Sequence, residues 1–597
     1  MFKFKNIAQT LRIQKFLPGE NTMMLVIAIS IGVTAGFANI LFRTVTDLVH
    51  QWIFVYGHKL LAIDEGGWRR LLLPLIPMTG MVLLIPLSLR YPGKVNGYAF
   101  TQFLRKVNIE GGIIKFRTII IKILSTSLTI GTGGSAGVEG PIATVGGALG
   151  SQVGQFFKVS GDRMKVYIAA GCAGGVGAMF NAPIAGIFFA SEIVLLGTYE
   201  ISSFSALVIS SAMATVVSRA YYGESPAFPI PDYHLINPAV EIPLYILMGV
   251  IIGIIAVFHI RFFYAVRDRF ALFRLHPQLK PIFGAFVVGS VAILFPQIMG
   301  DGYEYIAKVL SGDGAIWRMA LLIFLKIGAT AITLGSGGAG GVFAPALFIG
   351  AVIGGTFGAI ANLILPGLIS SPGAYGAVGI GAFLAASTHA PLTAIFLLFE
   401  MTGNYLIIIP IMVSSIIGTV VASRLSHDSI DTVDFSREGI DLHEGREAAI
   451  MRSIKVGSII TEDVDFISEN ANVDQLLKIF SITKDSFYFP VIDDSGQMTG
   501  IISMQDVKNI LHDEELRLCA RVGNICERNV ITLTPDDDLY TALTLYDVKG
   551  IEEIPVVESD ADRWVLGMLK RRDVINAYNR EVLKRGISER TASIRLK

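Results

Sequence analysis

Long apolar segments alternate with short polar ones along the first 425 residues of the chain. The first apolar segment, residues 22–42, is long enough to cross a bilayer, because a membrane-spanning α-helix takes about 20 apolar residues. Eight further segments have this length or nearly so, at residues 70–90, 113–130, 203–219, 242–262, 282–299, 316–334, 342–365 and 404–423. The pattern predicts a polytopic α-helical membrane protein.

Other apolar stretches are kept short by Gly and Pro. They cover residues 141–157, 165–180, 183–196, 374–387 and 391–400. We expect tilted or broken helices there, and such helices are tolerated at membrane depth only where they are buried in protein or line a cavity. This pattern is typical of a transporter or channel rather than of a membrane anchor.

Two halves of the apolar region carry the same motifs. Residues 133–141 read GGSAGVEGP, and residues 337–345 read GGAGGVFAP. In each half an Ala-Pro pair follows downstream, and a glutamate, Glu192 or Glu400, stands nine residues after the proline. Duplicated halves with interrupted helices place a substrate site at their interface. The motifs alone are compatible with parallel and with inverted halves.

The charged residues are concentrated towards the C-terminal end. Residues 426–597 carry 53 of the 98 charged side chains, although the whole chain is neutral. This segment has its own repeat, in which FPVI at 489–492 leads to GIIS at 500–503 and IPVV at 554–557 leads to GMLK at 567–570. Each copy predicts a helix, two strands and a second helix, and together they predict an α/β pair.

Basic residues and cysteines indicate the location of the chain. Lys3, Lys5, Arg12 and Lys15 precede the first apolar segment, and basic residues there favour a cytoplasmic N-terminus. Three cysteines are too few for a disulfide framework or a cysteine-rich zinc site. Two of them lie in the charged segment, which suits a reducing compartment. We expect a multi-pass protein of the cell (inner) membrane with both termini cytoplasmic.

The glycines of the two repeated turns admit three interpretations. Residues 335–340 fit the GxGxxG pattern, but the sequence lacks the downstream acid and the soluble βαβ context of a dinucleotide site. Close helix packing through small-xxx-small spacing explains glycines by itself. The glycines are also explained by a site at which backbone N–H groups converge on an anion at a helix start. Such a site favours anions and needs no buried cationic side chain.

One acid, Glu139, stands inside the first turn, and Phe343 holds the same place in the second. A carboxylate in an apolar span costs on the order of 3 kcal/mol, so it is a functional candidate by default. It can occupy an anion site with its own charge and leave when protonated, which makes a gate. Glu192 and Glu400 are weaker candidates, because an interfacial carboxylate bonded to backbone explains them as well.

The two turn motifs and EMTGNY at residues 400–405 resemble those of the CLC family of chloride channels and proton-coupled chloride antiporters. The resemblance covers residues from about 20 to 435, and the charged segment resembles a tandem pair of CBS domains, as in bacterial-type members. It implies a two-fold pseudo-repeat of tilted and broken helices followed by a cytoplasmic α/β CBS-domain pair. It also implies antiparallel halves, a homodimer with one pore per subunit, and chloride as the transported ion.

The expected division of the chain follows from the resemblance and the change in charge. It consists of an N-terminal segment (1–20), a transmembrane anion pathway (21–435, with halves at about 22–220 and 240–425), a linker (436–453), CBS domain 1 (454–514), CBS domain 2 (520–580) and a basic tail (581–597). Membrane lipid, chloride and a second copy of the chain are the expected partners, with no required cofactor. The balanced charge suggests no nucleic-acid partner.

The resemblance also assigns roles to single residues. Glu139 falls on the family's gating glutamate, and Val342 and Phe343 fall on the backbone amides that hold the central anion. The expected anion-binding residues are Asn96, Gly97, Gly137, Val138, Gly340, Gly341, Val342 and Phe343.

Four positions depart from the family pattern. Val138 replaces the usual arginine, Asn96 replaces a serine of the first anion-binding loop, and Asp431 replaces the tyrosine that caps the inner anion site. Ile193 stands where proton-coupled members keep an internal glutamate, and the adjacent Glu192 points about 100° away on a helix. The departures favour an uncoupled, channel-like conductor. The alternatives are proton-coupled exchange, with Glu192 or water carrying protons, and a variant selective for fluoride or nitrate.

In the CBS-like pair, Asp506 follows Ser503 in a Ser-x-x-Asp arrangement that can bind a ribose. The second copy keeps Asp573 but has Lys570 in place of the hydroxyl residue. Adenine-nucleotide regulation is one hypothesis, and a solvated acidic helix start is the other.

Two other classes of function fit less well. An intramembrane enzyme needs a nucleophile–base or metal constellation, and the histidines of the apolar segments are few and scattered. A ligand sensor without transport would rest on the CBS-like pair alone and would not need duplicated half-helices. We therefore expect a transport protein without enzymatic activity.

Overall fold

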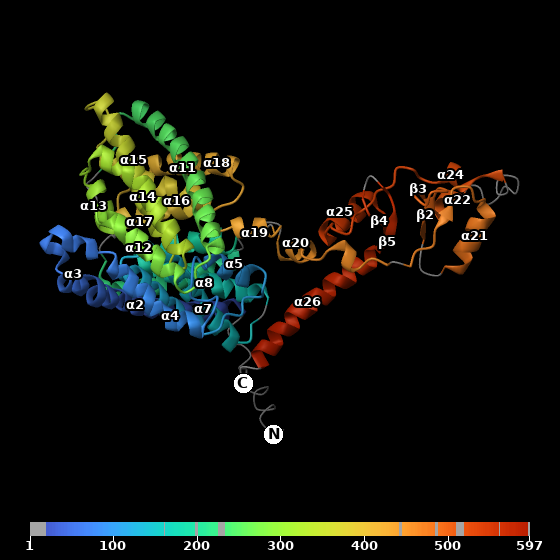
Figure 1. Cartoon of the computed structure of the whole chain (residues 1–597), viewed down its shortest axis with the longest axis horizontal. Helices are drawn as coiled ribbons and strands as arrows, with labels where there is room; N and C mark the ends of the chain where they lie inside the picture. Colours follow the sequence, from blue (N-terminus) through green and yellow to red (C-terminus); the bar gives the residue numbers. More distant parts are fainter. Residues whose placement is uncertain are drawn as a thin grey trace, which may run out of the picture. The chain divides into compact units, whose positions relative to one another are not determined.

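The computed structural model describes residues 20–159, 161–197, 201–224, 233–440, 445–461, 463–483, 487–508, 519–559 and 562–594. The chain forms two compact units, one ending at Asp434 and the other beginning at Phe435. The described part of the first unit is helical, whereas the second combines helices with two small sheets (Figure 1).

Helices of very different lengths make up the first unit (Figure 1). They are α2 (Glu20–Val49), α3 (Tyr56–Leu60), α4 (Leu75–Arg90), α5 (Phe100–Asn108), α6 (Arg117–Gly131), α7 (Glu139–Phe156), α8 (Asp162–Phe180), α9 (Pro183–Phe189), α10 (Ile201–Tyr222), α11 (Pro238–Leu272), α12 (Lys280–Ala292), α13 (Tyr303–Leu310), α14 (Ile316–Gly335), α15 (Phe343–Ile364), α16 (Pro372–Thr388), α17 (Pro391–Thr402) and α18 (Ile408–Leu425). The short helix α19 (Val433–Arg437) contains the boundary between the two units. Two π-helical segments, His50–Val55 and Ala190–Val194, extend α2 and α9.

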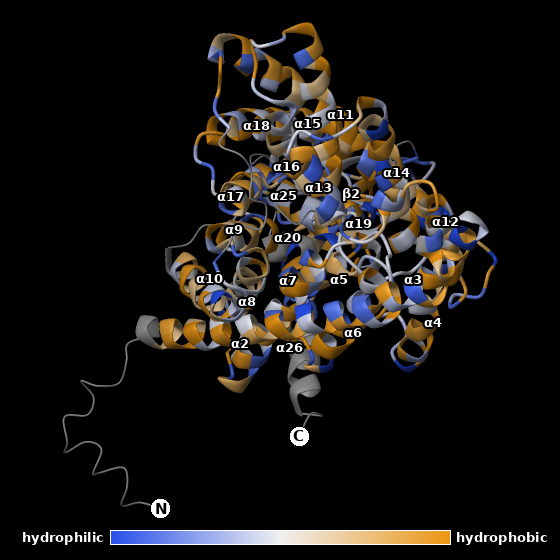
Figure 2. Cartoon of the chain, turned by 90° about the vertical axis from the view of Figure 1, so that its left-hand side faces the viewer, coloured by the Kyte–Doolittle hydropathy of each residue, from blue (hydrophilic) through white to orange (hydrophobic). Residues whose placement is uncertain are grey.

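Seven helical segments of the described chain are long and apolar enough to cross a membrane. They agree with seven of the nine long segments predicted from the sequence. The other two are shorter than predicted, because α6 begins only at Arg117 and α12 ends at Ala292, before the short 3₁₀ turn that starts at Pro296. Hydrophobic residues also cover outward-facing helices such as α2 (Figure 2), where Phe37 and Leu41 are exposed, as a lipid environment requires.

Glycines inside the helices allow close approach of neighbouring backbones. A Cβ on Gly146 of α7 would overlap the carbonyl oxygen of Gly171 in α8. A Cβ on Gly350 of α15 would overlap the carbonyl oxygen of Gly379 in α16 in the same way. Small-residue packing therefore explains the glycines of these helix pairs, once in each half.

The two Gly-rich turns pair with each other. The N–H of Gly137 donates to the carbonyl of Gly341 at 2.8 Å, and the N–H of Gly341 donates to the carbonyl of Gly137 at 2.7 Å. Each of the two glycines donates a hydrogen bond to the other and accepts one from it. Such a reciprocal contact is characteristic of a two-fold axis, so the two halves are related by a local two-fold axis here. α7 and α15 begin two residues after this pair, so the two helices start from one place.

The second unit contains two similar α/β domains (Figure 1). Its elements are α20 (Gly445–Arg452), β1 (Ile467–Ser468), α21 (Val473–Ile482), β2 (Tyr488–Ile492), β3 (Met498–Ser503), α22 (Met504–Val507), α24 (Val522–Ile525), α25 (Leu539–Lys549), β4 (Glu553–Val557), β5 (Val565–Lys570) and α26 (Arg571–Ile594). Both antiparallel strand pairs have the same register, with Pro490 opposite Ile501 and Pro555 opposite Met568. Backbone bonds between Ile501 and Glu527, 2.9 Å in each direction, join β3 to the segment after α24.

Candidate anion-binding site

Glu139 is the first residue of α7, and its side chain is fully buried. Its Oε2 accepts a hydrogen bond from the backbone N–H of Ala344 at 3.2 Å, and its Oε1 accepts one from the hydroxyl of Tyr303 at 2.9 Å. Ala344 lies in the first turn of α15. The carboxylate of the first half is thus placed at a helix start of the second half, where the helix dipole favours negative charge.

Gly137 makes room for this carboxylate. A Cβ on Gly137 would overlap Oε2 of Glu139 and would lie 2.9 Å from the amide nitrogen of Ala344. The backbone N–H groups of Val342 and Phe343 donate to no acceptor among the described residues. The carboxylate therefore lies at a helix start whose neighbouring amide donors are unused.

The loop before α5 reaches the second Gly-rich turn. The N–H of Gly97 donates to the carbonyl of Gly337 at 3.3 Å, so this amide is already engaged. The side-chain nitrogen of Asn96 lies 3.6 Å from the place that a Cβ on Gly337 would occupy. Within the described chain this side chain has no hydrogen-bond partner. Of the two loop residues predicted to bind an anion, Asn96 is the one with a donor to offer.

Asp431 is buried, and its carboxylate accepts a hydrogen bond from the hydroxyl of Tyr98. The Tyr98 ring packs in the same apolar cluster as Val138 and Val342. The Asp431 carboxylate is thus turned towards the Tyr98 hydroxyl. The motifs do not single out Tyr98, although it stands only two residues after Asn96.

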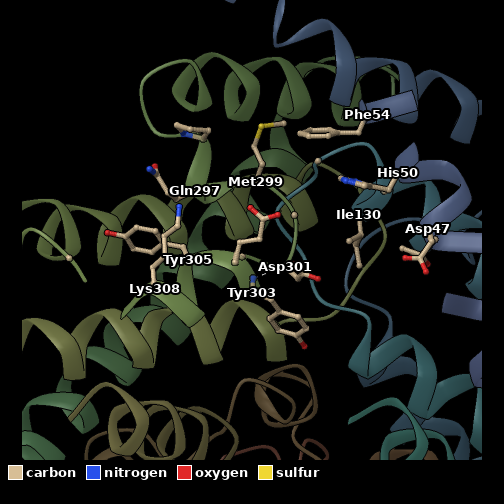
Figure 3. A pocket seen from close by; sticks show the side chains of 18 of the residues that line it. Asp47, His50, Phe54, Ile130, Gln297, Met299, Asp301, Tyr303, Tyr305 and Lys308 are labelled. Atoms are coloured by element: carbon tan, nitrogen blue, oxygen red, sulfur yellow. Dashed lines mark hydrogen bonds between the residues drawn. The ribbon is translucent and has the colours of Figure 1, made fainter. Parts of the chain in front are cut away.

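A cavity of about 660 Å³ opens beside Tyr303 (Figure 3). Asp47 and His50, at the end of α2, lie on one side of it, and Lys308 of α13 lies on another. Tyr303 lines this cavity and bonds Glu139, so it stands between the cavity and the carboxylate. We refer to this space as the vestibule.

A buried lysine supports the loop that leads to Tyr303. Lys326 of α14 is fully buried, and its Nζ donates to the carbonyls of Ile298 and Gly300 at 3.0 and 2.8 Å. Tyr303 and Lys326 belong to none of the repeated motifs, so the motifs do not identify them. The lysine could have been found from its position in an apolar segment, which is the same signal that made Glu139 conspicuous.

Glu192 and Glu400 make reciprocal contacts between the halves. Glu192 accepts hydrogen bonds from the N–H groups of Leu392 and Thr393 in the first turn of α17, at 3.0 and 2.7 Å. Glu400 accepts two such bonds in the first turn of α9, at 3.0 and 2.8 Å. Helix starts leave these N–H groups without partners inside the helix. The contacts support the structural interpretation of both carboxylates, and Ile193 beside Glu192 is a buried apolar residue.

We expect Glu192→Ala and Glu400→Ala each to destabilise the membrane unit. Each substitution leaves two N–H groups at a helix start without their acceptor, and an unsatisfied group costs about 1–3 kcal/mol where it is buried. Thermal unfolding in detergent should show a lower midpoint for both variants, whereas Glu110→Ala, which removes an exposed carboxylate, should not. Unchanged stability of Glu192→Ala together with altered proton transport would contradict the structural role.

The candidate nucleotide residues lie at equivalent helix starts of the two CBS-like domains. Asp506 accepts hydrogen bonds through Oδ2 from the N–H and the hydroxyl of Ser503, both at 2.7 Å. Asp573 lies in the first turn of α26, which follows β5 as α22 follows β3. Among the described residues, Oδ1 of Asp506 has no hydrogen-bond partner.

Comparison with known proteins identifies both units. The voltage gated chloride channel family matches residues 80–423, and the CBS domain family matches residues 456–513 and 522–580. The H+/Cl− exchange transporter ClcA of Vibrio parahaemolyticus is 30% identical over 416 residues, which cover 68% of this chain and 88% of that protein. Chloride channel protein CLC-f of Arabidopsis thaliana is 28% identical over 617 residues, covering 90% of this chain and 77% of that one.

A solved structure shows the same fold. The crystal structure of a slow cyanobacterial Cl−/H+ antiporter matches with a TM-score of 0.62 and 27% identity, over 70% of this chain and 97% of that one. The matches confirm the predicted family, the predicted pseudo-repeat fold and the CBS pair, and the relatives named here are channels and transporters. The chain therefore belongs to the voltage gated chloride channel (CLC) family and transports chloride across a membrane.

Proposed function

We propose that chloride passes between the starts of α7 and α15 and that the Glu139 carboxylate is the gate. The observation that carries this proposal is the hydrogen bond from the N–H of Ala344 to Glu139. The carboxylate takes a place at a helix start that suits a chloride ion equally well, with the N–H groups of Val342 and Phe343 beside it. Anion and carboxylate compete for these donors, because both accept charge-assisted hydrogen bonds.

Protonation changes the outcome of this competition. A protonated carboxyl group carries no negative charge and binds the helix start more weakly, since hydrogen bonds to charged groups are about twice as strong as neutral ones. Chloride then takes its place and has a route from the vestibule to the Asn96 loop. Gly137 leaves room for the carboxylate by lacking a side chain, and Gly340 and Gly341 lack side chains where the two turns pack closely against each other.

We propose that the conductor is uncoupled, in the manner of a channel. Ile193 supplies no carboxylate, and both oxygens of Glu192 accept hydrogen bonds at the start of α17. A proton path through the segment Ala190–Val194 therefore has only Glu192 to use, and the oxygens of that carboxylate are engaged in these hydrogen bonds. Proton-coupled chloride exchange is the second candidate, and the relatives named as exchangers favour it.

Reversal potentials distinguish the two candidates. With equal chloride on both sides of a planar bilayer, we expect the reversal potential to stay at zero when a proton gradient is imposed, because only chloride carries current. A chloride gradient alone, as the control, should move the reversal potential to that of chloride. A shift with the proton gradient would establish coupling and overturn the channel proposal. Substituting nitrate and fluoride in the same bilayers ranks the anions that pass the Asn96 amide.

We propose that the CBS pair binds an adenine nucleotide through Asp506 and Asp573. Oδ1 of Asp506, which accepts no hydrogen bond from the described residues, and the equivalent helix start at Asp573 support this. We expect AMP, ADP or ATP to raise the thermal unfolding midpoint of the full chain, and Asp573→Asn to reduce the increase. Asp494→Asn, on a turn of the same unit, serves as the matched control. The absence of any nucleotide effect on the wild-type chain would contradict the proposal.

We propose a homodimer in the cell membrane with both termini in the cytoplasm. The segment from residue 90 to 117, between α4 and α6, has six basic residues and one acid, whereas the segment from 56 to 74 has three and two. The excess of basic residues marks the cytoplasmic side, and the N-terminus lies on that side because α2 and α4 cross in opposite directions. Light scattering in detergent tests the dimer, and labelling of a cysteine added at residue 3 tests the orientation.

A further inference from the structure

A second cavity, of about 120 Å³, is lined by residues of α5, α6 and α7 and of the segments before α5 and α6. α7 packs against both α5 and α6. Its lining contains five basic residues and no Asp or Glu. The basic residues are Lys94, Lys106, Lys115, Arg117 and Lys122. Gln102, Thr118 and Thr144 add polar groups to the lining. We call this space the basic cavity.

The positive side chains at the mouth of the basic cavity repel one another. The pKa of Lys94, which lies in the loop between α4 and α5, is lowered first by burial and then by Arg117, Lys106 and Lys115. Neighbouring positive charges disfavour the protonated form of a lysine, and a bound anion favours it. A bound anion would therefore reduce the repulsion among these basic side chains.

Lys122 lies at the inner end of the basic cavity. It belongs to the apolar helix α6, is 7% exposed, and its ammonium group has no hydrogen-bond or ion-pair partner within the described chain. Charged residues inside membrane helices are rare, usually face a cavity or a partner, and mark ion pathways. Since Lys122 has no such partner among the described residues, what it faces there is the basic cavity.

The basic cavity continues towards the Gly-rich turns. Lys122 and Thr144 also line a small void of about 10 Å³ that touches Gly140 and Gly340. A void of that size has room for about one water molecule. The lysine thus stands between the basic cavity and the two turns at which α7 and α15 begin.

We propose that the basic cavity is a second anion site, a cytoplasmic side port that holds the transported anion at Lys122 before it reaches the Gly-rich turns. The role as a port rests on the proposed anion pathway, because it needs a destination at the turns. Binding at the site does not need transport, so the two can be tested separately. Its ligand class is a small monovalent anion, of which chloride is the probe.

Thiol modification measures binding directly. Gln102→Cys places a thiol in the lining, in a chain whose Cys519 and Cys526 are changed to Ser; Cys172 is buried. We expect a negatively charged methanethiosulfonate reagent to react about tenfold faster than a positively charged one, since basic clefts concentrate anions. Chloride should slow that reaction, and gluconate should not. Equal rates for the two reagents, or no protection by chloride, would overturn the proposal.

Matched variants show whether the preference comes from the cavity. Neutralising Lys106 and Lys115 together, by Lys→Gln, should remove the preference for the anionic reagent. Lys158→Gln removes one positive charge from an exposed residue after α7 that does not line the cavity, and it should leave the preference intact. If Lys158→Gln has the same effect per charge, surface potential rather than a site explains the data, and the proposal fails.

Currents test the role of Lys122. Lys122→Gln should lower chloride current from the cytoplasmic side several-fold and abolish chloride protection of the Gln102→Cys thiol, whereas Lys122→Arg should retain both. A thermal unfolding midpoint in detergent equal to that of the chain with Lys122 intact shows that the variant is folded. Chloride protection of the thiol in a Gln102→Cys chain that keeps Lys122 but passes no chloride current would support the site and refute the proposed channel. Wild-type current without protection would refute the site alone.

Discussion

Replacing Glu139 by Gln is expected to abolish the dependence of chloride flux on pH and to hold the flux high at every pH. A carboxamide cannot ionise, so it binds the N–H of Ala344 and the hydroxyl of Tyr303 only as a neutral group. Hydrogen bonds to a charged group contribute about 1.5–3 kcal/mol, against about 0.5–1.5 kcal/mol for neutral ones. The closed state therefore loses about 1–2 kcal/mol, which corresponds to a factor of about 5 to 30 in the ratio of open to closed molecules.

Chloride efflux from proteoliposomes over a range of pH measures this effect. The matched control is Glu192→Gln, which alters a second carboxylate that bonds a helix start, here that of α17, without touching the pathway. That variant should keep the pH dependence of the wild-type chain. If flux through Glu139→Gln still rises as the pH falls, another group is the gate.

Glu139 and Glu192 have the same chemistry and different surroundings. Both accept backbone N–H groups at the start of a helix from the opposite half. Glu139 is also bonded to Tyr303, which lines the vestibule, and it overlaps the space that Gly137 leaves empty. Glu192 has only the N–H groups and the hydroxyl of Thr393. A carboxylate can act as a gate where an anion can take its place. At Glu139 the space left by the missing side chain of Gly137 gives an anion room to do so.

The sequence predicts the parts of the pathway that are repeated. The two Gly-rich turns and the acid among them stand out because one motif occurs twice, and their pairing in space follows from the two-fold relation of the halves. The same repeat identifies Glu192 and Glu400, but not their partners. Those partners lie about 200 residues away, on a helix of the other half.

Residues outside the repeat are harder to find. Tyr303 reaches Glu139 from a segment 164 residues later that matches no motif, so its contact depends on how α13 packs against the start of α7. Lys122 and Lys326 could have been found, because a charge within an apolar segment has to be compensated or used. The length of α12 could not be read from hydropathy alone, since residues 282–299 remain apolar beyond the end of the helix.

Replacing Tyr303 by Phe is expected to raise chloride flux at neutral pH while preserving its dependence on pH. The substitution removes the 2.9 Å hydrogen bond to Oε1 of Glu139 and leaves the ring and the carboxylate in place. Loss of a hydrogen bond to a charged group is worth about 1.5–3 kcal/mol, so the closed state should be weakened by a factor of ten or more. Glu139 still titrates, which separates this variant from Glu139→Gln.

The same efflux measurement tests Tyr303→Phe against Tyr305→Phe. Tyr305 lines the same vestibule, and its ring stacks on Phe348 with the centroids 5.7 Å apart, away from Glu139. Removing its hydroxyl therefore changes the polarity of the vestibule by the same amount without freeing the gate. If both substitutions raise the flux equally, vestibule polarity is responsible and Tyr303 does not restrain the gate. If only Tyr303→Phe raises it, the hydroxyl holds the carboxylate at the start of α15, and opening requires this bond to break.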